Sequence, residues 1–349
     1  DALNPRESAV PHLTAEQHDR SAAVLLGLAC GDALGTSYEF GAPLPEGSPV
    51  SMQGGGWVNW APGEWTNDTS MVVPIALAAA AGRDLLDESV LDDIVAQWVE
   101  WAKSAPYVGI QLGAVLSRTE PMAAAVRLVA RRHHDRDGRS AGNGSLLRTA
   151  AVALACLDDP ATLAEAARTI SGLTHYERDA GDACVLWGLA IRHAVLEGEL
   201  DLRIGLGALP ADRGDLWSAR LGEAERKRPS EFPRNRWSVQ ALQGAWSSIT
   251  HAGATEAGAT DAGQFRLALE AAVRGGGDTG SVAAIAGGLL AARWGMAAIP
   301  GPWRRIVHGW PGLRGADLVR LAVVATRDRW AGRGAETRTV PLRVLRLVS

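Results

Sequence analysis

The sequence has few of the residues that would place it in a specialised class of protein. Its three cysteines, Cys30, Cys156 and Cys184, are scattered along 349 residues. An odd number of cysteines without metal-ligand spacing argues against a disulfide framework and a zinc site, and is typical of a reducing compartment. Each cysteine lies among Ala, Leu or Val residues, so we expect all three to be small buried hydrophobic residues.

Charge of one sign and long apolar runs are also scarce. The net charge is −4 and the isoelectric point is near 6.1. No basic block indicates a nucleic-acid surface, and no acidic tail indicates disorder. No apolar run reaches the ~20 residues that a membrane helix needs, and no segment has the pattern of a signal peptide. We therefore expect a cytoplasmic protein with no nucleic-acid partner and no membrane contact.

Phenylalanine and tyrosine number only three each, and the alternation typical of strands is nearly absent. The hydrophobic share of 47% is carried by Ala, Leu and Val, and Ala and Leu are the best helix formers. No repeat of fixed period is present. The sequence therefore predicts an all-α protein, a single compact multi-helix domain over residues 1–349 with its core at about 20–325.

Hydrophobic spacing and the positions of glycine and proline predict a succession of helices. We expect helices at 15–31, 69–81, 87–104, from 109, at 145–157, 161–172 and 177–198, from 238, and at 263–274 and 281–295. Four segments are expected without helix: a loop at 41–65, a polar loop at 131–144, an irregular connection at 199–236, and a basic tail at 331–349 that has no assigned place.

Two helix starts carry clusters of oxygen-bearing side chains. Thr66, Asn67 and Asp68 precede one apolar helix, and Asp278 and Ser281 follow three glycines at the start of another. N-capping explains one such cluster, but the repetition, with glycines that allow close backbone approach, suggests that the two starts face each other. Their oxygen atoms suit Mg²⁺, Mn²⁺ or Ca²⁺, and the absence of His and Cys near either cluster in the sequence disfavours zinc.

A third stretch, SAGNGSLLRTA at 140–150, is a glycine-rich turn that opens a helix. Backbone N–H groups and the positive end of the helix dipole make such a turn suitable for a phosphate. The alternative is a turn with no ligand, which the same residues would also form.

Taken together, these stretches resemble the ADP-ribosylglycohydrolase family, which includes the dinitrogenase-reductase-activating glycohydrolases. The matching stretches are GLACGDALGTSYE, EWTNDTSM, YVGIQLGAVL, GRSAGNGSLLR, the Thr-His pair at 174–175 and GGDTGSVAAIAGGLLAARWG. They follow the family's order from about residue 20 to about residue 325. The resemblance implies a compact all-α domain, a cleft for two divalent ions, and removal of ADP-ribose from a modified side chain or a small molecule.

The metal-ligand motifs depart from the family pattern at two positions. The residues that match, and that the resemblance implies as metal ligands, are Thr66, Asp68, Asp278 and Ser281. Asn67 and Gly280 stand where the family has aspartate; Asn67 can still offer an amide oxygen. Two carboxylates remain in these motifs. Because uncompensated buried charge is costly, we expect one well-held Mg²⁺ or Mn²⁺ ion and at most weak binding of a second.

The resemblance also implies roles around the sugar and the phosphates. It implies Asp68 as the acid or base and Glu39 in gating or protonation. Gly109 and Ile110 would lie along the ribose and diphosphate, and His175 would contact phosphate or adenine. The backbone donors implied for the diphosphate are those of Gly142, Asn143, Gly144 and Ser145. Trp57 or Trp60 is a candidate for stacking on a ring.

Three functions are compatible with these residues. The first is a metal-dependent hydrolase that frees ADP-ribose from arginine, another side chain or a small ADP-ribosyl compound. The second is a degenerate member of the family that binds ADP-ribose without turnover, which the departures at Asn67 and Gly280 favour. The third is a hydrolase of a related nucleoside or ribosyl phosphate. In the first two cases the partner is ADP-ribose or an ADP-ribosylated protein.

Overall fold

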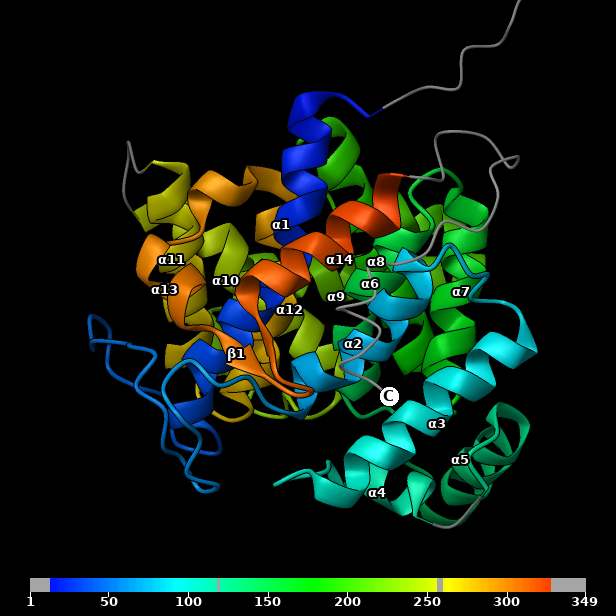
Figure 1. The fold of residues 1–349 in the computed structure, drawn as a ribbon. Coiled ribbons are helices and arrows are strands. Elements are labelled where there is room, and N and C mark those ends of the chain that lie inside the picture. The colour runs from blue at the N-terminus through cyan, green and yellow to red at the C-terminus, as the bar shows by residue number, and fades with distance from the viewer. Residues whose placement is uncertain (1–12, 118–119, 256–259, 328–349) are drawn as a thin grey trace, which may run out of the picture.

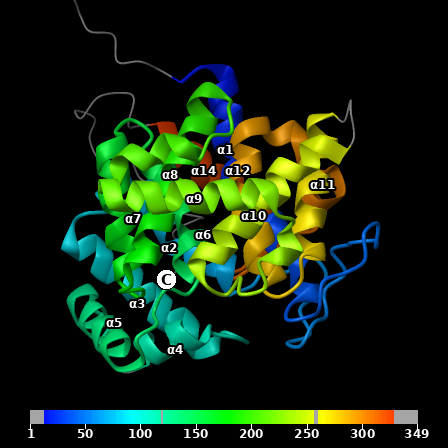
Figure 2. The same ribbon diagram turned by 180° about the vertical axis from the view of Figure 1, so that it is seen from behind.

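Helices account for almost all regular structure in residues 13–117, 120–255 and 260–327, the part of the chain that the computed structural model describes (Figures 1 and 2). The α-helices are α1 (Ala15–Gly35), α2 (Asn67–Ala80), α3 (Glu88–Ser104), α4 (Ile110–Leu116), α5 (Ala123–Asp137), α6 (Gly144–Ala155), α7 (Pro160–Gly172), α8 (Arg178–Glu197), α9 (Ala211–Arg226), α10 (Ser238–Thr255), α11 (Asp261–Arg274), α12 (Thr279–Trp294), α13 (Gly301–Ile306) and α14 (Gly315–Arg327). The 3₁₀ helices are η1 (Thr36–Tyr38), η2 (Arg203–Ala208), η3 (Pro229–Glu231) and η4 (Met296–Ala298). Strands β1 (His308–Gly309) and β2 (Leu313–Arg314) form a short antiparallel pair. The all-α prediction is confirmed.

Helices α1 and α12 pack backbone to backbone through the middle of the fold (Figure 1). Glycines in α1 make this possible: a Cβ atom at Gly31 would lie less than 3.0 Å from the backbone of Ala283. At the end of α1, a Cβ at Gly35 would lie 2.5 Å from the backbone nitrogen of Gly280. Only a residue without a side chain fits such an approach. The packing therefore places the last turn of α1 beside the first turn of α12.

The remaining helices surround this pair. Helix α2 packs on α6 and α14, and α8 packs on α6, α7 and α12. Buried hydrophobic residues from Leu13 to Ala325 form one continuous cluster, so the described residues share one core. Helices α3, α4 and α5 lie together at one end of the molecule (Figures 1 and 2).

The first helix is longer than the sequence predicts. The glycines after Cys30 indicated a turn, but α1 continues to Gly35. These glycines serve the close contact with α12 and do not break the helix, because glycine inside a helix is tolerated where packing offsets its entropy. The prediction of a helix end at residue 31 is therefore wrong, and Asp32 lies inside the helix.

The polar loop predicted at 131–144 is wrong in its first half, because α5 extends to Asp137. The charged residues there support the helix through pairs four residues apart, such as His133 with Asp137 at 3.0 Å. The helix ends at Gly138, which has a left-handed backbone with φ 65°. The polar composition of residues 131–137 therefore does not indicate irregular structure, because these residues form the last turns of α5.

The irregular connection predicted at 199–236 contains a 16-residue helix, α9. Its buried residues Trp217, Leu221 and Ala224 are spaced by four and three, so one narrow stripe faces the core. The other faces carry charged residues, which masked this stripe in the sequence. The short helices η2 and η3 flank it.

The predicted loop is confirmed over residues 41–65, where no helix forms.

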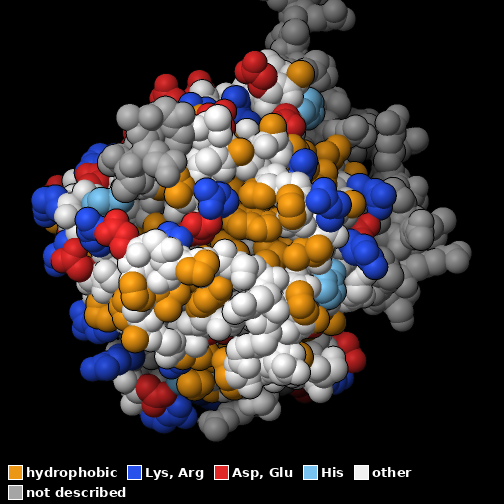
Figure 3. Space-filling view, turned by 90° about the vertical axis from the view of Figure 1, so that its left-hand side faces the viewer, with side chains coloured by type: hydrophobic (Ala, Val, Ile, Leu, Met, Phe, Trp, Pro, Cys, Tyr) orange, Lys and Arg blue, Asp and Glu red, His pale blue; other side chains and the backbone are white. Residues whose placement is uncertain are grey.

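Figure 3 shows the face of the molecule on the side of α11 and α13, where hydrophobic patches alternate with basic and acidic side chains. Within the described residues no helix is long and apolar enough to cross a membrane. The predicted tail at 331–349 lies outside the described residues.

Candidate active site

The N-terminal end of α2 holds Asp68 between two hydrogen-bond donors. Thr66 caps the helix by accepting the Asp68 N–H at 3.2 Å. Asn67 Nδ2 donates to Asp68 Oδ1 at 2.8 Å, and Ser281 Oγ donates to Asp68 Oδ2 at 2.7 Å. Because Ser281 belongs to α12, this last hydrogen bond joins the two helix starts.

Asp278 occupies the N-cap position of α12 without a side-chain capping hydrogen bond, and it lines the same cavity as Asp68. Its N–H donates to Asn235 Oδ1 at 2.9 Å, and its Oδ2 accepts from Asn143 Nδ2 at 2.8 Å. Ser281, whose hydroxyl donates to Asp68, also acts to lower the pKa of Asp278, so this serine is close to both carboxylates. The expectation that the two helix starts meet in space is confirmed.

Asp32, which the sequence analysis did not single out, ties α1 to the first of these helix starts. Its two carboxylate oxygens accept hydrogen bonds from the backbone N–H groups and hydroxyls of Thr66 and Thr69, at 2.7–3.0 Å. The hydroxyl of Thr66 thus faces Asp32. Asp32 is the one acid in the apolar stretch 21–35, which was a usable signal in the sequence.

Glu39 fills the space that a side chain at position 280 would occupy. A Cβ atom built at Gly280 would lie 2.3 Å from Glu39 Oε1. Trp57 lies near the Glu39 carboxylate and acts to lower its pKa. The carboxylate of Glu39, from the segment after α1, therefore lies where the side chain of an aspartate at position 280 would begin. The site contains this carboxylate in addition to the two that the motifs supply.

The acidic groups of this site raise one another's pKa. Burial raises the pKa of Asp68 well above its usual value, and the neighbouring carboxylates add to the rise. Burial likewise raises the pKa of Glu39, with further contributions from the charges of Asp278 and Asp32. Burial raises the pKa of Asp278, against the opposing hydrogen bond from Asn143. Such mutual repulsion is typical of sites that bind a cation or transfer a proton.

These groups line a cavity of about 260 Å³. The predicted site residues on its wall are Glu39, Asn67, Asp68, Gly109, Ile110, Gly142, Asn143, Gly144, His175, Asp278 and Ser281. Thr66 and Ser145 are not on the wall: Thr66 faces Asp32, and Ser145 Oγ accepts from Ser171 Oγ at 2.9 Å inside the core. Trp60 is buried away from the cavity, whereas Trp57 is 56% exposed and stacks edge-on with Tyr107, a wall residue.

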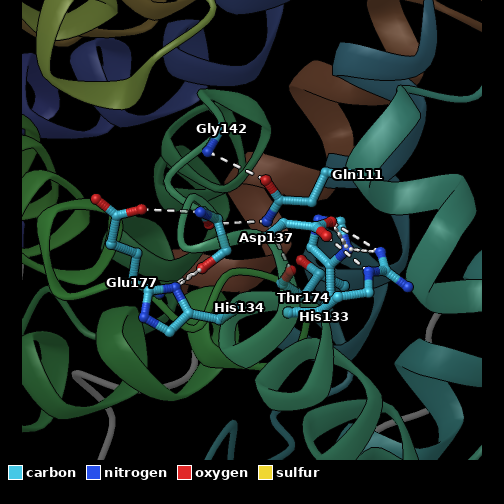
Figure 4. A network of polar contacts seen from close by, with 9 residues as sticks. Gln111, His133, His134, Asp137, Gly142, Thr174 and Glu177 are labelled. Carbon is cyan, nitrogen blue, oxygen red and sulfur yellow. Dashed lines mark hydrogen bonds and ion pairs between the residues drawn. The ribbon is translucent and has the colours of Figure 1, made fainter.

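A network of polar contacts holds the segment before α6 (Figure 4). Gln111 Nε2 donates to the carbonyl oxygens of Ser140 at 2.8 Å and Thr174 at 2.9 Å, and Gln111 Oε1 accepts from the N–H of Gly142 at 3.3 Å. Ser140 N–H donates to Glu177 Oε2 at 2.8 Å. Two side chains, Gln111 and Glu177, therefore hold the turn through three hydrogen bonds.

This network narrows the set of backbone donors that a phosphate could use. The N–H of Gly142 is committed to Gln111, and the N–H of Asn143 donates to the carbonyl of Arg236 at 2.9 Å. Gly144 and Ser145 are the first two residues of α6, whose N–H groups have no acceptor within the helix. The first turn of α6 thus remains suited to an anion.

The donors around Asp68 and Asp278 are oxygen atoms, which fit a hard divalent cation. Within the described residues, no three His, Cys, Asp or Glu side chains form a metal-binding group by themselves. An ion here would also need the hydroxyl of Ser281, the amide oxygen of Asn67 or water. Burial first, and the neighbouring carboxylates second, raise the pKa of Asp68 and Glu39, and a nearby positive charge would act in the opposite direction.

Known proteins resemble this chain in sequence and in fold. Residues 13–334 match the family model for ADP-ribosylglycohydrolase. The chain belongs to the ADP-ribosylglycohydrolase family. The expected enzyme class, an ADP-ribosyl glycohydrolase, is thereby confirmed.

Individual relatives support the same assignment. The chain is 29% identical over 292 residues to the ADP-ribosyl-[dinitrogen reductase] glycohydrolase of Rhodospirillum rubrum, covering 82% of this chain and 89% of that protein. It is 27% identical over 305 residues to the ADP-ribosylarginine hydrolase Tri1 of Pseudomonas putida strain GB-1, covering 86% and 78%. A solved ADP-ribosylglycohydrolase-related protein complex superposes with a TM-score of 0.66 at 27% identity, over 90% of this chain and 99% of that chain.

Proposed function

We propose that this ADP-ribosylglycohydrolase removes ADP-ribose from ADP-ribosylated arginine in a protein. The observation that supports it best is the convergence of three sequence-distant features on one cavity: the start of α2, the start of α12 and the glycine turn of α6. Two relatives are named for ADP-ribosylated dinitrogen reductase and ADP-ribosylarginine, which supports an N-glycosidic linkage.

Asp68 is the proposed acid and base. Its carboxyl group would donate a proton to the leaving guanidine nitrogen, whose bond to the anomeric carbon of ribose breaks. The resulting carboxylate then accepts a proton from the water that adds to the oxocarbenium-like carbon. The hydrogen bonds from Asn67 and Ser281 hold both oxygens of Asp68 in place during this exchange.

Metal dependence is part of the proposal. A divalent ion held by Asp68, Asp278 and Ser281 would supply orientation of the ribose hydroxyls and Lewis-acid polarisation. The three carboxylates on the cavity wall, Glu39, Asp68 and Asp278, are opposed by the guanidinium of Arg236. The carboxylates outnumber this guanidinium, which supports the proposal that the site binds a divalent ion.

The test is release of ADP-ribose from an ADP-ribosyl-arginine peptide, measured by chromatography with Mg²⁺, with Mn²⁺ and with chelator. We expect release that depends on the metal and is lost in D68N, which keeps the shape of the side chain. Substrates joined through serine or glutamate linkages test the preference for arginine. Equal release from all three would contradict the linkage, and metal-independent release would contradict the ion.

A second candidate function is binding of ADP-ribose without turnover. It is supported by the Asn67 amide, which donates to Asp68 where the family pattern has a carboxylate. Calorimetric binding of ADP-ribose together with no release from any of the three substrates would favour it over hydrolysis.

A further inference from the structure

Arg148 is a buried arginine on the wall of the active-site cavity. Its side chain is 1% exposed, and its guanidinium stacks on Trp98 at 4.5 Å. Among the described residues, its Nε and Nη1 have no hydrogen-bond partner and no carboxylate pairs with it. Burial lowers the pKa of Arg148 to about 10, so it remains charged at neutral pH. A buried charge without a counter-ion is costly and calls for a functional reason.

The polar contacts of Arg148 lead to His175. Arg148 Nη2 donates to Thr174 Oγ1 at 2.7 Å, and Thr174 Oγ1 lies 2.7 Å from His175 Nδ1. Arg148 Nη2 is itself 3.5 Å from the same Nδ1 atom. All three groups therefore meet at one nitrogen of the imidazole.

The chemistry of these groups fixes the direction of each hydrogen bond. A guanidinium only donates, so Thr174 Oγ1 must accept from Arg148 and can direct its own hydrogen to His175 Nδ1. A proton on Nδ1 would face the N–H groups of the guanidinium, and a charged imidazolium would add a second positive charge. Nδ1 is therefore the acceptor, and the proton of the neutral imidazole lies on Nε2.

The protonated edge of His175 faces the glycine turn of the cavity. Cβ atoms built at Gly142 and Gly144 would lie 3.2 Å and 3.8 Å from His175 Nε2. Gly142, Gly144 and His175 all line the cavity. The Nε2–H group is thus beside the first turn of α6, where the backbone is suited to an anion.

We propose that Arg148 is a positioning residue that locks His175 as a neutral Nε2–H donor for the phosphate groups of the ligand. The proposal rests on the proposed function for the identity of the ligand, a nucleoside diphosphate sugar, but its first part concerns the free protein alone. Gln111 supports the same arrangement by holding the carbonyl of Thr174.

Burial and Arg148 act against the protonation of His175. Burial lowers the pKa of His175 well below its usual value, and the positive charge of Arg148 on α6 lowers it further. The donor on Nε2 should therefore persist unchanged from about pH 5.5 to 8, on both sides of the usual histidine pKa of about 6.5. A histidine that titrated in this range would make phosphate binding depend on pH.

The decisive measurement is the ¹⁵N chemical shift of the His175 ring nitrogens in the free protein, followed from pH 5.5 to 8. We expect a single Nε2–H tautomer throughout in the wild type. R148M keeps an unbranched side chain beside Trp98, but it is shorter than arginine and removes the guanidinium and its donors. It should give a mixture of tautomers and titration nearer the ordinary value. T174V, which interrupts the contact at a different residue, should shift the tautomer population in the same direction.

The functional measurement is calorimetric binding of ADP-ribose at pH 5.5 and pH 8. The contribution of His175 should change the affinity of the wild type less than about twofold between the two pH values. R148M should bind ADP-ribose about threefold to tenfold more weakly than the wild type at pH 8, and it should recover part of this loss at pH 5.5. R192M is the matched control: Arg192 is half-buried and donates to the carbonyl of Leu157, away from the cavity. It should leave the His175 signals and the affinity unchanged.

Each result either supports or overturns the proposal. An Nδ1–H tautomer or a charged imidazolium in the wild type would overturn it without any variant. So would unchanged His175 signals in both R148M and T174V, since a purely structural arginine would leave the tautomer as it is. Failure of ADP-ribose to bind the wild type would count against the proposed function alone, because the spectroscopic result would still stand.

Discussion

Replacing Gly280 by alanine tests whether Glu39 supplies the carboxylate that the second motif lacks. Residue 280 is the second residue of α12, and its added Cβ would lie 2.3 Å from Glu39 Oε1. That oxygen is the far end of a flexible side chain, so it can retreat to about 3.4 Å, where ordinary contact begins. The substitution should displace the carboxylate by about 1 Å and leave the backbone in place.

The expected effects on folding and on metal binding have opposite signs. Alanine in place of glycine inside a helix stabilises it by up to about 1 kcal/mol, so the melting temperature should stay unchanged or rise. If Glu39 is a metal ligand, its displaced carboxylate would no longer reach the ion, because metal–oxygen distances tolerate a change of only about 0.2 Å. Loss of one such ligand should weaken Mg²⁺ and Mn²⁺ binding by at least about tenfold, equivalent to about 1.4 kcal/mol.

The assay is calorimetric titration of Mg²⁺ and Mn²⁺ into the wild type, G280A, E39Q and the double variant. If G280A acts by displacing Glu39, it should add nothing once that charge is removed, so the two changes should be strongly non-additive. G244A is the matched control, because a Cβ at Gly244 meets nothing closer than 3.5 Å and lies on α10. It should leave metal affinity unchanged.

Wild-type metal affinity in G280A, or losses that simply add in the double variant, would refute the role given to Glu39. The same geometry changes the expectation for a restoring substitution. Aspartate at position 280 would exclude Glu39 from its present place, so G280D exchanges one carboxylate for another and should not add a charge.

Three further predictions concern stability. D68N should abolish release of ADP-ribose and should raise the melting temperature at pH 7 in chelator. The melting temperature should rise because the raised pKa of Asp68 means that its charged form, present as pH rises, destabilises the fold. A lower melting temperature would contradict this. G31A should destabilise by several kcal/mol in denaturant titration, since its Cβ would lie within 3.0 Å of the α12 backbone, which cannot yield as a side chain can; a two-state stability equal to that of G244A would contradict it. Burial raises the pKa of Asp179, but hydrogen bonds from Arg220 and Arg213 outweigh this effect and lower the pKa overall. The stability that Asp179 contributes at neutral pH should therefore disappear as pH falls below about 4. The difference in melting temperature between the wild type and D179N should vanish there.

The sequence by itself determined the helical class and most helix positions, because hydrophobic spacing and capping are local properties. It also predicted that Asp68 and Asp278 meet, from the repetition of an oxygen-rich helix start. Local sequence patterns gave wrong predictions where a residue contacts a segment that is distant in the sequence. The glycines of α1 look like a turn until α12 is placed against them, and the polar residues of α9 hide a single buried stripe around Trp217.

Tertiary structure alone decided the charge and the hydrogen-bond donors of the site. Nothing near Gly280 in the sequence indicates that Glu39, 241 residues earlier, occupies its side-chain space. Asp32 and Arg148 look like isolated polar residues in apolar helices, and their partners Thr66 and Thr174 lie on other segments. Electrostatic and steric effects depend on distances across the packed core, and sequence spacing fixes such distances only within one element.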